Sequence, residues 1–199
     1  MKSLRIFLGI AFLFHTLYIL GADHLRPQPQ QCVLAKGYFI VGKMQLSTPV
    51  LSQEWKQFVT EMGGTLTDQS ASSINIKLVD AIDNVSVNKE EAYRLTITPK
   101  AITVEVAERG VYWAMQTLYQ LKEEKGKKIR LQCATITDWP AFRIRGFMQD
   151  VGRSYLSLEE LKREIAILSR FKINTFHWHL TENQAWRLES KIFPMLNDS

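Results

Sequence analysis

The chain has 199 residues, of which 46% are hydrophobic and 23% are charged, and its 25 Lys and Arg against 20 Asp and Glu give a formal net charge of +5. This composition excludes a wholly disordered or collagen-like chain and allows one ordinary domain, or two small ones, with a real core. Two cysteines exclude a disulfide-rich scaffold and a four-cysteine zinc module. Because most basic residues are mixed with acidic ones, we expect no nucleic-acid partner.

The first 22 residues have the pattern of a secretory signal peptide. Lys2 and Arg5 precede an apolar run over 6–20, and the small residues Gly21 and Ala22 follow it. A membrane-spanning helix needs about 20 apolar residues, so the run is too short for one. We therefore expect cleavage after Ala22, export to a periplasmic or extracellular space, and no membrane anchor in the mature chain.

Residues 23–138 are predicted to form a small α+β domain, with helices packed on one face of a sheet. Alternation of apolar and polar residues predicts strands, and Pro99-Lys100 between two of them indicates a hairpin. Apolar residues at helical spacing predict two helices, the first of them capped by Ser52. In chain order the predicted elements are strand 38–41, helix 52–62, strands 73–79, 93–97 and 102–107, helix 110–122 and strand 129–136.

The two cysteines, Cys32 and Cys133, lie in this region. In an exported protein they are compatible with a single disulfide. Two unpaired thiols are the alternative, and the sequence leaves both possibilities open, as it does the oligomeric state.

A second pattern, over residues 139–199, follows Asp138-Trp139-Pro140. It predicts a strand over 142–151, a helix that begins at a capping box formed by Ser157 and Glu160, and a strand over 173–180. A strand, a helix and a strand within about 40 residues form a βαβ unit, whose strands run parallel with a right-handed crossover. The fold class is therefore α+β followed by α/β.

Polar and aromatic side chains gather where these two predicted strands end. They are Asp150, Arg153, His177, His179, Glu182 and Trp186. In βα folds ligands bind at the carboxyl ends of parallel strands, so Arg153 and Glu182 are predicted to share one rim. A guanidinium beside a carboxylate presents fixed donors and acceptors to vicinal sugar hydroxyls. The alternative is a rim ion pair without a ligand.

The two histidines leave a second hypothesis open. His177 and His179 point the same way on a strand, because side chains repeat every two residues. A His-x-His pair at a barrel strand end is compatible with a metal site and hence with a metal-dependent hydrolase. The sequence shows no third ligand, so we expect no metal and no cofactor, and we interpret the histidines as hydrogen-bonded supporting residues.

Two segments resemble a known family. Residues 138–153 read DWPAFRIRGFMQDVGR, and residues 176–187 read FHWHLTENQAWR. They are similar to the first two strands of the catalytic barrel of β-N-acetylhexosaminidases, family 20 of the glycoside hydrolases. Residues 93–121 resemble that family's non-catalytic N-terminal domain. The resemblance implies a small α+β domain followed by the start of a (β/α)₈ barrel.

The resemblance also implies a function. Members of the family remove terminal N-acetylglucosamine or N-acetylgalactosamine from glycans with retention of configuration, because the substrate's own acetamido oxygen attacks the anomeric carbon. An Asp orients that acetamido group, and the neighbouring Glu is the general acid. By position, Arg153 matches the Arg that holds hydroxyls of the terminal sugar, and Glu182 matches an acidic position of the same subsite. Asp150, His177, His179 and Trp186 are expected to support them.

The sequence departs from the family pattern by several substitutions and by the absence of the family's catalytic pair. Glu182 stands where many relatives have Asp, Asn183 replaces a second acid, and Ala185 replaces a Gly. No Asp-Glu dipeptide occurs in the 199 residues, so no catalytic residue is assigned among them. We therefore expect the front part of a longer enzyme, inactive by itself; a non-catalytic carbohydrate-binding or interaction module is the alternative. Linkage and hexosamine preference remain open.

Overall fold

The computed structural model describes residues 24–107 and 109–196, and the chain divides after Ala141 into two compact units. The predicted signal peptide, 1–22, lies outside the described residues. Among the residues that are described, none belongs to a helix long and apolar enough to cross a bilayer.

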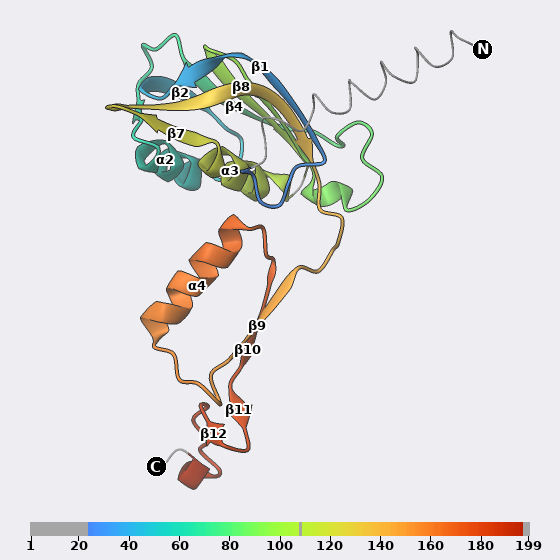
Figure 1. Ribbon diagram of the computed structural model, residues 1–199, viewed down its shortest axis with the longest axis vertical. Coiled ribbons are helices and arrows are strands. Elements are labelled where there is room, and N and C mark those ends of the chain that lie inside the picture. Colours follow the sequence, from blue (N-terminus) through green and yellow to red (C-terminus); the bar gives the residue numbers. More distant parts are fainter. Residues whose placement is uncertain (1–23, 108, 197–199) are drawn as a thin grey trace, which may run out of the picture. The chain divides into compact units, whose positions relative to one another are not determined.

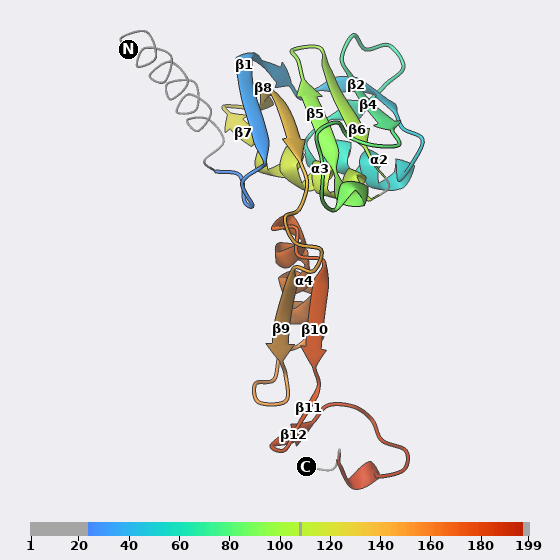
Figure 2. The same ribbon diagram turned by 90° about the vertical axis from the view of Figure 1, so that its right-hand side faces the viewer.

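The first unit is a mixed sheet with two helices on one face, as predicted (Figures 1 and 2). The strand order is β1-β8-β5-β6-β4-β2-β3, with β7 paired to β8; β5 runs antiparallel to β6, which confirms the predicted hairpin. The helices are α2 (Ser52–Glu61) and α3 (Gly110–Gln120), and a short 3₁₀ turn, Lys89–Glu91, precedes β5. The strands are β1 (Gln31–Ile40), β2 (Lys43–Ser47), β3 (Thr65–Leu66), β4 (Ser73–Leu78), β5 (Tyr93–Ile97), β6 (Ala101–Val106), β7 (Lys122–Lys125) and β8 (Lys128–Asp138).

The core of this unit lies between the sheet and the two helices. Helical spacing places Trp55, Phe58 and Val59 of α2 on one buried side, as predicted. α3 adds Ala114 and Leu118, both fully buried against alternate residues of β5 and β6. Burying each large apolar side chain stabilises the fold by roughly 1.5–3 kcal/mol, so this layer holds the unit together.

Local predictions at three element ends were wrong. Ser52 does not cap α2, because Leu51 occupies the cap position in a left-handed conformation (φ 50°), without a side-chain hydrogen bond. α3 ends at Gln120, and Lys122 already belongs to β7, where it pairs with Leu131. The first predicted strand, 38–41, begins too late, because β1 already starts at Gln31, where it pairs with Thr137 of β8.

Both cysteines are free thiols. Cys32 lies opposite Ile136 in the β1–β8 pairing, so Cys133 is three register positions away, too far for a disulfide. Burial raises the pKa of each thiol.

The second unit is built on the predicted βαβ pattern. β9 (Gly146–Asp150) and β10 (Thr175–His179) are parallel and are joined by α4 (Leu158–Arg170). The capping box is confirmed: the Ser157 hydroxyl accepts a hydrogen bond from the Glu160 amide, and the Ser157 amide donates to the Glu160 carboxylate. A small hairpin and a 3₁₀ turn follow: β11 (Thr181–Glu182), β12 (Ala185–Trp186) and Pro194–Leu196.

Both strands of this unit are shorter than the predicted 142–151 and 173–180. Just before β9, the Arg145 amide donates to the side chain of Asn174, and the Arg145 guanidinium donates to the Lys172 carbonyl. Backbone hydrogen bonds from the Asn174 and Thr175 amides to the Arg145 carbonyl accompany these side-chain contacts at the amino ends of the strands. Within the strands, Phe147 and Phe176 stack with ring centroids 6.4 Å apart.

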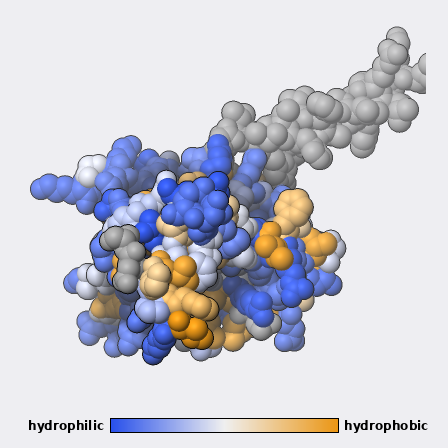
Figure 3. All heavy atoms as spheres, turned by 90° about the horizontal axis from the view of Figure 1, so that it is seen from below, coloured by the Kyte–Doolittle hydropathy of each residue, from blue (hydrophilic) through white to orange (hydrophobic). Residues whose placement is uncertain are grey.

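The second unit leaves much apolar surface exposed. The predicted stripe on α4 is only partly covered, since Leu161 is buried while Leu158 and Ile165 are exposed. Figure 3 shows apolar patches between hydrophilic areas on one face of the molecule. Large apolar residues at least 65% exposed in this unit are Phe142, Ile144, Tyr155, Ile192, Phe193 and Met195. Such surface is unusual for an isolated domain and marks positions suited to further packing.

Gly110 should be indispensable to the first unit. A Cβ there would lie 2.0 Å from the Ala92 carbonyl oxygen, so backbone must move. We expect Gly110→Ala to lower the opening free energy of β5 and β6 by about 2–3 kcal/mol, although alanine in a helix normally gains about 1 kcal/mol. Amide hydrogen exchange measures this quantity. Gly42→Ala, which meets nothing within 4 Å, is the control; equal effects of the two substitutions would contradict the prediction.

Candidate sugar-binding site

The register of β9 and β10 sets the position of the site. Asp150 pairs with His179 at the carboxyl ends of the two parallel strands, and the Val151 amide adds one more hydrogen bond to the His179 carbonyl. The loop after β9 and the hairpin after β10 therefore start at the same edge. This is the edge at which βα folds bind their ligands.

Arg153 is held by Asp150. The Arg153 amide donates to Asp150 Oδ1 at 3.1 Å, and Arg153 Nε donates to Asp150 Oδ2 at 2.5 Å. These hydrogen bonds lower the pKa of Asp150 and raise that of Arg153, so both groups stay charged. The Asp150 side chain is 13% exposed and that of Arg153 is 61% exposed, so the guanidinium remains accessible to a ligand.

Glu182 lies beside this pair, on the hairpin that follows β10. Its Oε2 is 3.3 Å from His179 Nε2, and its Oε1 accepts a hydrogen bond from the Asn183 amide. One oxygen or nitrogen of each of Asp150, His179 and Glu182 lies within 4.8 Å of the others. The carboxyl ends of two strands thus bring two carboxylates and an imidazole to one place.

Arg153 and Glu182 lie at the same end of the strands, as predicted, but they do not form the direct ion pair that the sequence suggested. The ion-pair partner of Arg153 is Asp150, three residues earlier, and Glu182 contributes only its charge to the raised pKa of Arg153. An aspartate in the same turn reaches the guanidinium with less loss of side-chain freedom than a residue on another loop.

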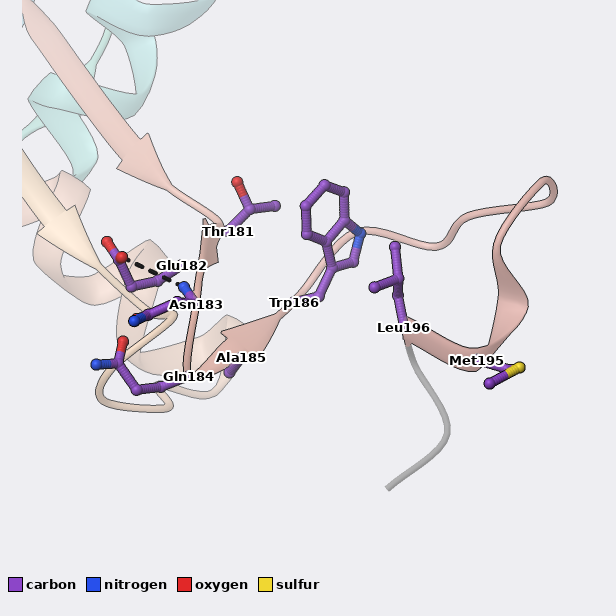
Figure 4. Close-up of a pocket in the computed structure, with 8 residues that line it drawn as sticks. All are labelled: Thr181, Glu182, Asn183, Gln184, Ala185, Trp186, Met195 and Leu196. Atoms are coloured by element: carbon purple, nitrogen blue, oxygen red, sulfur yellow. Dashed lines mark hydrogen bonds between the residues drawn. The ribbon is translucent and has the colours of Figure 1, made fainter.

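His177 and Trp186 lie away from this group. His177 shares a strand face with His179, with ring centroids 5.9 Å apart, but sits two residues before the strand end. Trp186 pairs with Thr181 in the hairpin, whereas Glu182 pairs with Ala185, so Trp186 and Glu182 project from opposite hairpin faces. In Figure 4 the Trp186 ring lies toward Leu196, in an open pocket of about 550 Å³. Glu182 also lines this pocket, but its side chain points away from the Trp186 ring.

The metal hypothesis named two histidines, and the structure groups only one of them with acidic side chains. Over the described ranges 24–107 and 109–196, the side chains close enough to share a cation are Asp150, His179 and Glu182, and His177 is not among them. Asp150 is already engaged by Arg153 through both oxygens. One of the three side chains that could hold a cation is therefore already paired with the Arg153 guanidinium.

Sequence reasoning missed two residues that shape the site. A Cβ on Gly152 would lie 3.0 Å from Glu182 Cβ, so a glycine there allows the hairpin to approach the end of β9. Arg187 Nε donates to the Val151 carbonyl at 3.1 Å and so links the two loops. The spacing Asp150-x-x-Arg153 was a signal for the ion pair, but no sequence signal pointed to Arg187, because its partner is a backbone atom.

Comparison with known proteins covers almost the whole chain. Residues 23–139 match glycosyl hydrolase family 20, domain 2, and residues 142–199 match the glycosyl hydrolase family 20 catalytic domain. The chain belongs to glycosyl hydrolase family 20. The fold prediction is thereby confirmed: a small α+β domain precedes the start of the family's barrel.

Curated relatives and solved structures of the family agree with this assignment. A beta-hexosaminidase from Porphyromonas gingivalis is 42% identical over 125 residues, which are 59% of this chain and 16% of the relative. One from Vibrio furnissii is 41% identical over 110 residues, 55% of this chain and 18% of the relative. The chain thus spans less than a fifth of the length of either relative.

Two solved structures share the fold. The GH20 exo beta-N-acetylglucosaminidase from Vibrio harveyi in complex with N-acetylglucosamine has a TM-score of 0.74 and 29% identity, covering 89% of this chain and 28% of that one. The beta-N-acetylhexosaminidase from Bacteroides fragilis has a TM-score of 0.71 and 30% identity, covering 87% and 36%.

Removing the Arg153 guanidinium is expected to raise the pKa of Asp150 part of the way toward its ordinary value, because the side-chain hydrogen bond and the charge of Arg153 are lost while its amide hydrogen bond, the largest cause of the lowering, remains. A carbon-13 NMR pH titration of the Asp150 carboxyl in Arg153→Met measures the change. In the unaltered chain the pair's stabilisation is full above the ordinary Asp pKa and is lost as pH falls through the lowered one. Arg143→Met, at the other end of β9, is the control; an unchanged Asp150 pKa in Arg153→Met would contradict the assignment.

Gly152→Ala is expected to displace the hairpin that carries Glu182. The new Cβ forces the Glu182 segment to shift by a few tenths of an ångström. Replacing glycine also restricts the unfolded chain, which is stabilising, but overpacking should outweigh that gain. We expect the opening free energy of β9 and β10, measured by amide exchange, to fall by about 1 kcal/mol. Gly146→Ala, whose Cβ would meet Thr175 at 3.8 Å, should leave that free energy unchanged or slightly higher. The reverse order of the two variants would show the prediction wrong.

Proposed function

We propose that the protein is a β-N-acetylhexosaminidase, which removes terminal N-acetylglucosamine or N-acetylgalactosamine from glycans. The observation that carries the proposal is the meeting of Arg153, Asp150, His179 and Glu182 at the carboxyl ends of β9 and β10 in a family 20 chain. The relatives named beta-hexosaminidase and the Vibrio harveyi enzyme crystallised with N-acetylglucosamine support the substrate class.

In this proposal Arg153 donates hydrogen bonds to hydroxyls of the terminal sugar. Its guanidinium has five N–H donors in a fixed plane, and Asp150 occupies Nε, which leaves the other nitrogens for a ligand. Glu182 supplies acceptor oxygens from the neighbouring hairpin, and one of them lies 3.3 Å from His179 Nε2. Vicinal hydroxyls both donate and accept hydrogen bonds, so a donor group and an acceptor group at the same edge of the sheet suit them.

The reaction itself needs groups that these residues do not supply. In the substrate-assisted scheme the acetamido oxygen attacks the anomeric carbon, and an acid protonates the leaving oxygen. The 199 residues contain no Asp-Glu dipeptide to match the family's pair. We therefore propose that the residues of this chain bind and orient the sugar and do not by themselves cleave the glycosidic bond.

Binding of N-acetylglucosamine to the purified 199-residue chain, followed by NMR, tests the proposal. Arg153→Met and Glu182→Gln should each raise the dissociation constant about tenfold or more, since each removes a charged hydrogen-bonding partner. Arg143→Met removes an exposed guanidinium at the opposite end of β9 and should change nothing. We expect no hydrolysis of a nitrophenyl N-acetylglucosaminide.

Three results would count against this function. Absence of sugar binding, or equal binding by Arg153→Met and the unaltered chain, would contradict the assignment of the site. Hydrolysis of the nitrophenyl substrate by the chain would contradict the proposal that these residues bind the sugar without cleaving the bond. A stoichiometric metal found by elemental analysis would instead favour the metal-dependent hydrolase.

A further inference from the structure

The two loops that carry the proposed sugar-binding residues have little backbone pairing between them. Strand pairing of β9 with β10 ends at Asp150 and His179, and the Val151 amide makes the last ladder-like hydrogen bond. Arg153 lies three residues beyond the end of β9, and Glu182 three beyond the end of β10. Their separation must therefore be fixed by side chains.

Arg187 spans the gap between these two loops. Its amide donates to the Leu180 carbonyl at 2.9 Å, which closes the base of its own hairpin. Its Nε donates to the Val151 carbonyl at 3.1 Å, and its guanidinium lies 5.7 Å from the centre of the Tyr155 ring. Val151 and Tyr155 flank Arg153 by two residues on either side, so Arg187 contacts the Arg153 loop at two points around that residue.

We propose that Arg187 is a positioning residue that fixes the distance between Arg153 and Glu182. This inference rests on the proposed function, since it concerns the same sugar site, but it assigns Arg187 no contact with the sugar. A planar guanidinium can hold a carbonyl with one nitrogen while its face lies toward an aromatic ring, and a lysine ammonium lacks that geometry. The carbonyl partner and the ring together orient the Arg153 loop relative to the hairpin.

The test compares Arg187→Met, Arg187→Lys and the control Arg143→Met in the whole chain. The first readout is the dissociation constant of N-acetylglucosamine, which Arg187→Met should raise about tenfold. Arg187→Lys should lie between Arg187→Met and the unaltered chain, because it keeps one donor and loses the planar contact. Arg143→Met should bind the sugar normally.

A second readout needs no ligand. The amides of Arg153 and Asn183 are hydrogen-bonded to Asp150 and Glu182, so their exchange rates report the order of the two loops. Arg187→Met should speed exchange at both amides and leave the amides of α4 unchanged.

The two readouts separate the possible failures. Normal sugar binding by Arg187→Met, or unchanged loop exchange, would overturn the positioning role. Faster exchange in α4 as well would also overturn it, because Arg187 would then stabilise the whole unit. If the unaltered chain binds no sugar, the proposed function fails, and the loop amides alone decide whether Arg187 fixes the two loops.

Discussion

The parallel pairing of β9 with β10 is the constraint on which the candidate site depends. Its register places Asp150 opposite His179, so both loops leave the sheet at one edge. A shift of one strand by one residue would place Asp150 and His179 on opposite faces of the sheet, because side chains alternate along a strand. The loops that carry Arg153 and Glu182 would then leave the sheet in a different relative position, and the two side chains would not meet at one edge.

Within that frame, the ion pair of Asp150 and Arg153 determines geometry more than it contributes to stability. The Arg153 side chain is 61% exposed, and ion pairs open to solvent contribute little to stability. The pair instead fixes the guanidinium through an amide and a side-chain hydrogen bond from the same loop. Glu182 lies beside His179. Its negative charge raises the pKa of Arg153 without a direct contact between the two side chains.

The two units bury apolar surface to different extents. The first covers one sheet face with α2 and α3, and its largest core side chains are almost fully buried. The second has a single helix beside two short strands and exposes large apolar residues such as Phe142, Ile144 and Ile192. Its site is held by the Asp150–Arg153 pair within one loop and by the Arg187–Val151 hydrogen bond between two loops.

Sequence alone determined the features that depend on periodicity and short-range chemistry. Alternation identified the β5–β6 hairpin, the helical period identified the buried side of α2, and the Ser157–Glu160 spacing identified a cap. Chain order and the right-handed crossover rule placed Arg153 and Glu182 at one edge. Only the tertiary structure decided that Trp186 projects from the other hairpin face and that Arg187 links two loops. These contacts depend on register and on backbone atoms, which side-chain patterns do not encode.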